Sequence, residues 1–279
     1  MTRAAILGGG AVGQALSRAL PDASVEVALR WNRSKLARPW TQRLPSLRSY
    51  DLVFLAVSDG AVAALCETLD VGRGQLVVHL AGALPLSALS AARARGAATG
   101  SLHPLRAIHT GEVQPFQGAA AGIGASSPAA RRTLSRLARK LGLQPLPVAD
   151  DARALYHAAA VLSAAGQVAL FSESVRAFRE ATGASDRDAR RALLPLTLGA
   201  LAKLLDAPAP AALSGPVVRG DAATVRAHRA ALPADLVALY DELARVSVRL
   251  ARAGKRAGTL QLAEIELALQ PARTRRRRG

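Results

Sequence analysis

Three glycines near the start of the chain have a spacing that suits phosphate chemistry. Gly8, Gly10 and Gly13 fit the pattern G-x-G-x-x-G, directly after a short apolar run. In this pattern the first glycine permits a tight turn, the second lets the backbone approach a pyrophosphate, and the third lets a helix pack against a strand. The start of that helix, at Ala11 and Val12, would hold the negative charge. A glycine-rich turn without a ligand is the alternative interpretation.

The end of the second apolar run is rich in cations. This predicted strand, residues 24–30, should end beside the ribose of a bound dinucleotide, where NAD sites usually carry an acidic residue. No acid occurs there, and Arg30, Asn32, Arg33 and Ser34 occupy the position. Because guanidinium groups make paired bonds to phosphate oxygens, this segment favours the 2′-phosphate of NADP over NAD. Ordinary surface cations of a basic protein are the alternative.

Two histidines have positions that suit proton exchange. His103 follows a predicted strand at the carboxyl edge of a sheet, and His157 lies in the first turns of a long predicted helix. Imidazole titrates near neutral pH, so either residue is a candidate catalytic acid or base for a hydride-transfer reaction. Both also have structural interpretations, as a turn-forming residue and as an ordinary helix residue. His79, on a buried strand, is interpreted as structural.

A polar stripe competes with His157 for the lining of a substrate cleft. Ser163 and Gln167 share the helix face of Tyr156, whereas His157 points about 100° away from Tyr156. Tyr156 and His157 are therefore not expected to enter one cleft. Arg219, in a loop before a predicted helix, is a candidate for binding an acidic substrate. A stripe at this spacing is more often a core or a subunit interface, and the alternative role of Arg219 is to pack its loop against a partner subunit.

Short apolar runs that alternate with helical patterns must position these residues. Over residues 1–150 this alternation predicts a Rossmann domain, an α/β fold with a doubly wound, mostly parallel sheet. Val57 and Ser58 end the third strand and should border the cofactor, because ligands bind at the carboxyl ends of such strands. The strands are predicted over residues 3–7, 24–30, 51–57, 75–80, 97–102, 119–123 and 144–148.

After residue 150 the strand pattern ends and helical patterns replace it. Residues 151–269 predict an all-helical domain for substrate binding and dimerisation, starting with one long helix over 151–182. A second helix over 185–205 contains Pro195, which should kink it. The Arg-rich tail, 270–279, is predicted to be disordered.

Composition limits the classes of function. The formal charge of +17 is spread along helices and the tail, and aromatic residues are only 3% of the chain, so specific nucleic-acid binding is not expected. One cysteine, Cys66, excludes an internal disulfide, and the scattered histidines lack metal-ligand spacing, so no metal site is predicted. Without an unbroken apolar run of about 18 residues or a secretory signal, we expect a cytoplasmic protein that does not bind membranes.

Several motifs carry a resemblance to known proteins. The glycine loop, the segment 32–34 and the strand 51–57 resemble the superfamily of pyrroline-5-carboxylate reductase, 6-phosphogluconate dehydrogenase and the 3-hydroxyacid dehydrogenases. Three later motifs, at residues 100–105, 156–161 and 213–221, resemble a bacterial family of Rossmann-like proteins whose C-terminal helical domain has no assigned function. The resemblance implies an NAD(P)-binding domain, an all-α domain like that of 6-phosphogluconate dehydrogenase, and homodimers formed through the helical domain.

One departure from that family leaves two hypotheses open. The helix after the Tyr-His motif tends to carry an Asn in the family, whereas this chain has Leu-Ser-Ala-Ala-Gly-Gln over residues 162–167. Ser163 or Gln167 could substitute as the polar group. The leading hypothesis is an NADP-dependent oxidoreductase that acts on a small molecule in the cleft between the domains. The second is a non-catalytic dinucleotide-binding or sensor protein that retains the Rossmann fold.

Overall fold

The structure, a computed structural model, describes residues 1–112 and 114–270. It divides into two compact units, Met1–Ala165 and the chain from Gly166 onward. Helix α5 (Arg153–Ser163), which the sequence analysis placed in the helical domain, belongs to the first unit. The predicted Arg-rich tail lies outside the described residues, apart from its first residue.

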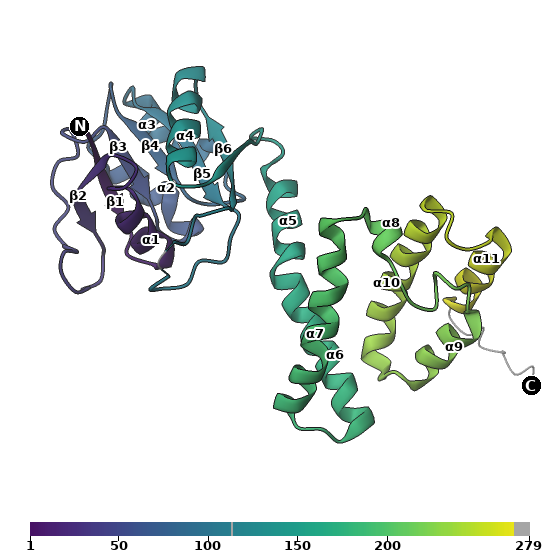
Figure 1. The fold of residues 1–279 in the computed structure, drawn as a ribbon. Helices are drawn as coiled ribbons and strands as arrows, with labels where there is room; N and C mark the ends of the chain where they lie inside the picture. The colour runs from purple at the N-terminus through teal and green to yellow at the C-terminus, as the bar shows by residue number, and fades with distance from the viewer. Residues whose placement is uncertain (113, 271–279) are drawn as a thin grey trace, which may run out of the picture. The chain divides into compact units, whose positions relative to one another are not determined.

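The first unit is built on one seven-stranded sheet with the order β2-β1-β3-β4-β5-β6-β7 (Figure 1). All neighbouring strands are parallel except β5 and β6, which are antiparallel. The predicted mostly parallel, doubly wound sheet is confirmed. Chain order reverses at β1, which lies between β2 and β3, and open α/β sheets bind ligands beyond the carboxyl ends of strands at such a point. The strands are β1 (Thr2–Leu7), β2 (Val25–Trp31), β3 (Leu52–Leu55), β4 (Leu76–His79), β5 (Ala98–Pro104), β6 (Ala120–Ala125) and β7 (Gln144–Pro147).

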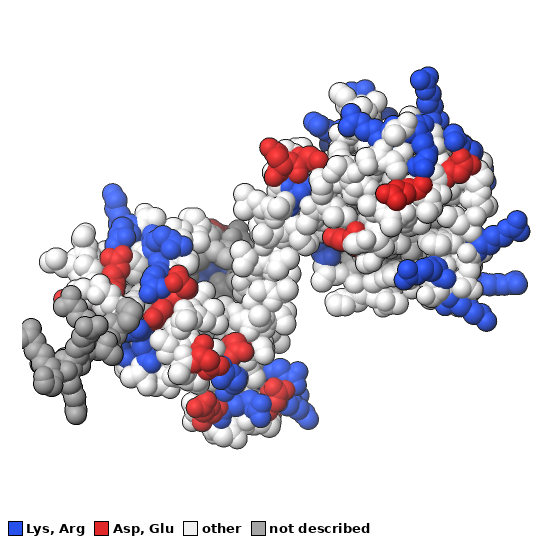
Figure 2. Space-filling view, turned by 180° about the vertical axis from the view of Figure 1, so that it is seen from behind, with Lys and Arg blue, Asp and Glu red and all other residues white. Residues whose placement is uncertain are grey.

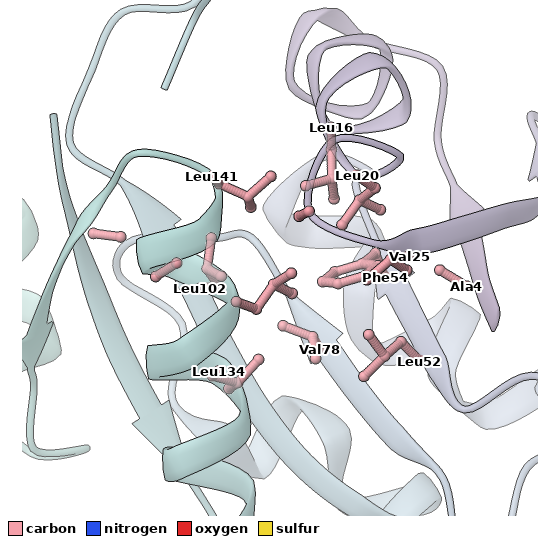
Figure 3. Close-up of a cluster of buried hydrophobic side chains, with 14 of the residues drawn as sticks. Ala4, Leu16, Leu20, Val25, Leu52, Phe54, Val78, Leu102, Leu134 and Leu141 are labelled. Atoms are coloured by element: carbon pink, nitrogen blue, oxygen red, sulfur yellow. The ribbon is translucent and has the colours of Figure 1, made fainter. Parts of the chain in front are cut away.

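Helices cover both faces of this sheet. On one face, Leu16 of α1 and Leu134 of α4 pack against Phe54 and other strand residues in a buried core (Figure 3). On the other face, Val53 packs with Val62 of α2. Because side chains alternate along a strand, the uninterrupted apolar sequence of β3 supplies both cores. The helices are α1 (Ala11–Ala19), α2 (Asp59–Thr68), η1 (Leu86–Leu89), α3 (Ser90–Ala94) and α4 (Pro128–Lys140).

The second unit contains helices only in its described part. A small core forms where Val225, Val248 and Ile265 meet from three helices. Pro195 lies inside a helix that continues past it. The predicted long helix over 151–182 is interrupted at Ala164, whose backbone leaves the helical conformation, with φ −117° and ψ −82°. The elements are α6 (Ala165–Thr182), α7 (Asp186–Ala202), η2 (Lys203–Leu205), α8 (Ala209–Ala212), α9 (Ala222–Ala231), α10 (Ala234–Ala253) and α11 (Thr259–Ala268).

Many apolar side chains on the long helices are exposed. Leu162 in α5, Val168 in α6 and Leu196 in α7 are 69%, 72% and 70% exposed. The segment Arg153–Thr182 has the length and mean hydropathy, 1.4, of a membrane-spanning helix, and none of its most apolar window is buried. The requirement for an unbroken apolar run missed this segment, because single Ser, Gly and Gln residues interrupt the run without making it polar on average.

Charged side chains are distributed over the surface. Lys and Arg side chains project from many places on the face drawn in Figure 2, with Asp and Glu among them, whereas much of the surface of the long helices is uncharged. The net charge of +17 therefore does not gather into one patch on that face. In the described part of the chain, no three His, Cys, Asp or Glu side chains group closely enough to hold a metal ion.

Candidate functional site

The glycine loop between β1 and α1 has the shape that dinucleotide binding requires. Gly8 has φ +119°, and a β-carbon there would overlap the carbonyl oxygen of Ala56 at the end of β3. A β-carbon at Gly13 would overlap the carbonyl oxygen of Gly8, so the helix starts in close contact with the turn. At Gly10, by contrast, a β-carbon would meet nothing within 4 Å. The loop is thus closed toward the protein and open at Gly10, as the pyrophosphate pattern predicts.

Asn32 fixes this loop from the end of β2. Its side-chain oxygen accepts a hydrogen bond from the backbone N–H of Gly9 at 2.9 Å, and its side-chain nitrogen donates to the carbonyl of Ser34 at 2.8 Å. The same side chain therefore orients the glycine loop and the cationic segment that follows β2. Their geometry is established before any ligand binds, which reduces the entropic cost of binding.

A cavity of about 440 Å³ opens beside the glycine loop. Seven of the predicted cofactor residues line it: Gly8, Gly10, Asn32, Arg33, Ser34, Val57 and Ser58. Sequence reasoning missed the other half of the wall, which is formed by Gly9, Trp31, Ala56, Ala61, Ala64, Leu65 and Thr68. The missed α2 residues recur at the spacing of one helix face, with mostly small side chains, and this spacing indicates which face of α2 turns inward but does not indicate a ligand.

Three other predicted cofactor residues lie in the first turn of α1, and a fourth, Arg30, lies outside the cavity lining. Ala11, Val12 and Gly13 begin the helix whose N-terminus faces the loop. Arg30 does not line the cavity, because its guanidinium donates to the Ser17 hydroxyl on α1 and to the carbonyl of Val27 at 2.8 Å. Burial also lowers the pKa of Arg30. The prediction of a phosphate-binding pair of arginines therefore reduces to Arg33.

The two predicted catalytic histidines come together at the carboxyl ends of the central strands. His103 is the next-to-last residue of β5, and its ring centroid lies 5.6 Å from that of His157 on α5. Tyr156 also reaches this point, with its hydroxyl 2.9 Å from His103 Nδ1. Tyr156 and His157 therefore meet at the same ring, although their helix positions point them apart; that they do not enter one substrate cleft stays a prediction. The His103 ring contacts both Tyr156 and His157. The angle of about 100° between these two positions on α5 therefore does not keep their side chains apart.

Three glycines let α5 approach the sheet this closely. A β-carbon at Gly122 would lie 2.5 Å from the Tyr156 hydroxyl oxygen, and one at Gly124 would lie 2.5 Å from Arg153 Nη2. A β-carbon at Gly82 would overlap His157 Nδ1 and lie 3.0 Å from His103 Nε2. Gly122 and Gly124 alternate along β6 and so share one face of the sheet. Alternating glycines inside a strand indicate a close approach, and this was the available signal in the sequence.

A buried arginine lies beneath these rings. Arg153 is 1% exposed, and its Nη1 donates to the carbonyl of Gly82 at 3.4 Å. Its Nε is 3.4 Å from a carboxylate oxygen of Asp150, which also accepts from the backbone N–H of Leu86 at 2.8 Å. Arg153 Nε and Nη2 have no hydrogen-bond partner. A buried guanidinium with unused donors is costly, which makes Arg153 a candidate site residue that the sequence analysis missed.

Burial and this positive charge set the ionisation of the histidines. Burial, chiefly, lowers the pKa of fully buried His79 to about 4, and the charge of Arg153 adds to the effect. Burial likewise lowers the pKa of His103 to about 4, with contributions from His157 and Arg153. Burial raises the pKa of the Tyr156 phenol. At neutral pH, His79 and His103 are therefore neutral imidazoles beside a protonated phenol.

The predicted substrate residues are not part of this cluster. Ser163 is exposed at the last residue of α5. Gln167 on α6 and Arg219 before α9 belong to the second unit, and both are exposed. Their roles in substrate binding, and a substrate cleft between the domains, stay predictions.

Comparison with known families adds an identity for part of the chain. Residues 119–246, from β6 into α10, match the family described as "Domain of unknown function (DUF2520)". The resemblance to a Rossmann-like family with a helical domain of unassigned function is thereby confirmed. The DUF2520 match includes Arg153, Tyr156 and His157 but not the glycine loop. No curated protein matches the chain in sequence.

Solved structures with the same fold extend over nearly the whole chain. A Thermotoga maritima protein is 19% identical, with a TM-score of 0.70 over 90% of this chain and 99% of its own. A reductive aminase from Aspergillus terreus, in complex with NADPH and ethyl levulinate, is 19% identical, with a TM-score of 0.60 over 96% and 99%. Pyrroline carboxylate reductase of Plasmodium falciparum, with NADP bound, is 11% identical, with a TM-score of 0.57 over 95% and 98%. These similarities confirm the predicted fold class.

Proposed function

We propose that this chain is an NADP-dependent oxidoreductase that transfers a hydride between the nicotinamide and a small molecule. The observation that carries the proposal is the open position at Gly10, inside a cavity that Arg33 and Ser34 also line. Two similar structures, the Aspergillus terreus and Plasmodium falciparum enzymes, hold NADPH and NADP on the same fold, which supports this choice. The bound nicotinamide would supply or accept the hydride.

The residues of the cavity fit the parts of the dinucleotide. The loop amides and the N-terminus of α1 would hold the pyrophosphate, and the guanidinium of Arg33 would bind the 2′-phosphate. Arg33 is exposed, and no carboxylate in the described part of the chain forms an ion pair with it. Trp31 offers an apolar ring at the end of β2 for the adenine.

Calorimetric titration with NADPH and NADH tests the cofactor. NADPH should bind more tightly, and Arg33→Ala should weaken NADPH about 10- to 100-fold while leaving NADH nearly unchanged, because a charged hydrogen bond contributes about 1.5–3 kcal/mol. Arg132→Ala, at an exposed position on α4, is the matched control for the loss of one positive charge. Equal affinity for both nucleotides in the parent protein contradicts the assignment of NADP.

The histidine cluster supports catalysis over simple nucleotide binding. In this proposal, neutral His103 or the neighbouring His157 would exchange a proton at the atom beside the hydride carbon. NADPH consumption with ethyl levulinate, or with cyclohexanone and allylamine, is a direct assay using compounds bound by the Aspergillus terreus enzyme. His157→Ala should abolish most turnover without changing NADPH affinity. NADPH binding without turnover of any carbonyl or imine favours the alternative, a non-catalytic dinucleotide-binding or sensor protein.

We also propose that the protein is a homodimer formed through its helical domain. Monomeric proteins rarely expose large contiguous apolar patches. On α7 and η2 the exposed leucines are Leu194, Leu196, Leu198, Leu201, Leu204 and Leu205. Their neighbours in sequence between residues 192 and 202 include no charged residue, which suits a second copy of the same uncharged face.

Sedimentation velocity tests the assembly. The parent chain should sediment as a dimer and Leu196→Glu as a monomer, because a charge would be buried at the interface. Arg131→Glu on α4 is the control for a charge change on an exposed helix face of the first unit. A monomeric parent chain contradicts the proposal. Flotation of the parent chain with phospholipid vesicles would instead assign the apolar helices to a membrane.

A further inference from the structure

A second cavity, of about 220 Å³, lies at the opposite edge of the sheet from the glycine loop. It opens where Thr2 begins β1 and Val25 begins β2, whereas the glycine loop follows the end of β1. The six residues of β1 separate the two places by roughly 17 Å, at about 3.3 Å per residue. Val25 and Leu52, on the floor of the cavity, also belong to the buried core drawn in Figure 3. A ligand in this cavity would leave the glycine loop free.

The wall of this cavity carries positive charges and hydroxyl groups. Arg136 and Lys140 come from α4, about one helical turn apart, and Thr133 of the same helix joins them. Thr2 and Ser24 supply two further hydroxyls from the starts of the strands. The lining residues, all of which the structure describes, include no Asp or Glu. Guanidinium, ammonium and hydroxyl groups without a competing carboxylate suit a phosphate group.

The stability of its helix does not explain Arg136. Cations in the last turn of a helix complement the negative end of the helix dipole, which accounts for Arg139 and Lys140. Arg136 lies before that turn, and no carboxylate among the described residues forms an ion pair with it. The sequence from 128 to 149 contains no Asp or Glu. The guanidinium of Arg136 is therefore available to a bound anion.

Lys140 and Ser24 form one rim of the cavity. The ammonium of Lys140 donates to the carbonyl of Ala23 at 3.3 Å, which joins the end of α4 to the turn before β2. This bond uses one of the three ammonium donors, so two remain. Ser24 follows in the same turn with φ +64°, a left-handed conformation that favours glycine. A serine is strained there relative to glycine, and it supplies a hydroxyl that glycine lacks.

We propose that this cavity is a second ligand site of the first unit and that it binds the phosphate group of a small molecule. Arg136 and Lys140 donate to the phosphate oxygens, and the hydroxyls of Ser24 and Thr133 complete the set of contacts. The cavity has half the volume of the one beside the glycine loop, about 220 against 440 Å³, which suits a phosphate with a short attached chain and not a dinucleotide. The site does not depend on the proposed oxidoreductase function.

Titration with inorganic phosphate and with glycerol 3-phosphate, followed by backbone amide NMR, tests the site. The glycine loop can also attract phosphate, so the amides of Ser24 and Thr133 are followed separately from that of Gly10. Both anions should shift the Ser24 and Thr133 resonances saturably at physiological ionic strength, with a dissociation constant of about 1 mM or tighter. Tighter binding of glycerol 3-phosphate assigns an organic phosphate, and tighter binding of inorganic phosphate assigns the free ion. The absence of a saturable shift at these two residues overturns the proposal.

Paired substitutions on α4 separate a built site from the general positive charge of the chain. Arg136→Gln should weaken phosphate binding at least about tenfold, because a hydrogen bond between two charged groups is lost. Arg139→Gln removes the same charge from the same helix at an exposed position that does not line the cavity, and should weaken binding less than about twofold. Equal weakening by both substitutions would assign binding to diffuse charge and overturn the proposal.

Ser24→Gly gives a result that a purely structural role would not produce. Glycine adopts this φ without strain, so the Tm should rise, whereas loss of the hydroxyl should weaken phosphate binding about 2- to 10-fold. A higher Tm with unchanged phosphate affinity would remove this rim from the site and overturn the proposal. NADPH affinity should be the same in Arg136→Gln and the parent chain. If NADPH binds to neither, the oxidoreductase proposal fails, whereas the phosphate titration still decides the second site.

Discussion

Glycine has opposite roles in two regions of the candidate site: the glycine loop with its cavity, here called the nucleotide end, and the contact of α5 with the sheet, here called the α5 end. At the nucleotide end, Gly10 leaves space into which no protein atom projects. At the α5 end, Gly82, Gly122 and Gly124 leave spaces that polar side chains of α5 fill. The first arrangement prepares a surface for a ligand, and the second draws polar groups into the protein and removes them from water. Affinity should therefore depend mainly on the first end, whereas stability and ionisation depend on the second.

The largest expected effect is the pH dependence of stability at the α5 end. His79 and His103 have folded-state pKa values of about 4, below the usual value of 6.5. The unfolded chain binds more protons between these values, so unfolding free energy falls as pH drops from about 6.5 to 4. Each histidine contributes about 3 kcal/mol to this loss, to order of magnitude. Urea unfolding across this pH range measures it.

A substitution in β4 assigns that pH dependence to the cluster. His79→Leu loses no hydrogen bond, because neither ring nitrogen has a partner, and should flatten the pH dependence by about half. His109→Leu, at an exposed position, should leave the profile unchanged. If both substitutions reduced the pH dependence of the unfolding free energy equally, that dependence would not arise from the buried histidines. The α5 end would then not control ionisation as proposed.

The nucleotide end was largely predictable from sequence, and the α5 end was not. The glycine spacing and the residues after β2 and β3 are local patterns, and seven of the residues chosen from them line the cavity. Arg30 was expected to contact the cofactor because of its position near the end of a strand. Its guanidinium instead donates to Ser17 on α1, a tertiary contact that strand position does not reveal. Arg153 and Gly82 are 71 residues apart and meet only in the folded chain. Helix geometry predicted that Tyr156 and His157 point apart. It could not show that His103, from β5, contacts both of them.

The next effect comes from filling a space that is already occupied. Gly122→Ala places a methyl group against the Tyr156 hydroxyl and should destabilise the protein by about 1–3 kcal/mol, since overpacking forces side chains from their positions. Thermal unfolding should show a lower Tm, and NADPH affinity should be unchanged. Gly60→Ala, in α2 where a β-carbon meets nothing within 4 Å, is the control. An unaltered Tm would mean that Tyr156 of α5 does not pack against Gly122 of β6 as closely as the structure shows.

A smaller and opposite effect is expected from filling the open space. Gly10 has φ −69°, which any residue can adopt, so Gly10→Ala should leave the Tm unchanged. The methyl group would occupy room needed by the pyrophosphate and weaken NADPH at least about tenfold, or about 1.4 kcal/mol. In calorimetry, Gly10→Ala should lose NADPH affinity and keep its Tm, whereas Gly122→Ala should keep NADPH affinity and have a lower Tm. A common loss of Tm in both variants would show that the two glycines serve the same purpose.

The smallest effect is expected from removing the buried charge itself. Arg153→Met keeps most of the side-chain volume and removes two donors that form no hydrogen bond, together with the 3.4 Å ion pair to Asp150, a carboxylate that is 45% exposed. Replacing a poorly paired buried ion by an apolar residue is often neutral or stabilising, so unfolding free energy should stay constant or rise by about 1 kcal/mol. A large destabilisation would show that Arg153 is well paired in solution and holds α5 on the sheet. If the unfolding free energy is unchanged and the titration of Tyr156 shifts, the charge of Arg153 acts on ionisation at the α5 end and not on stability. The cavity at Gly10 has no buried charge of this kind in its lining.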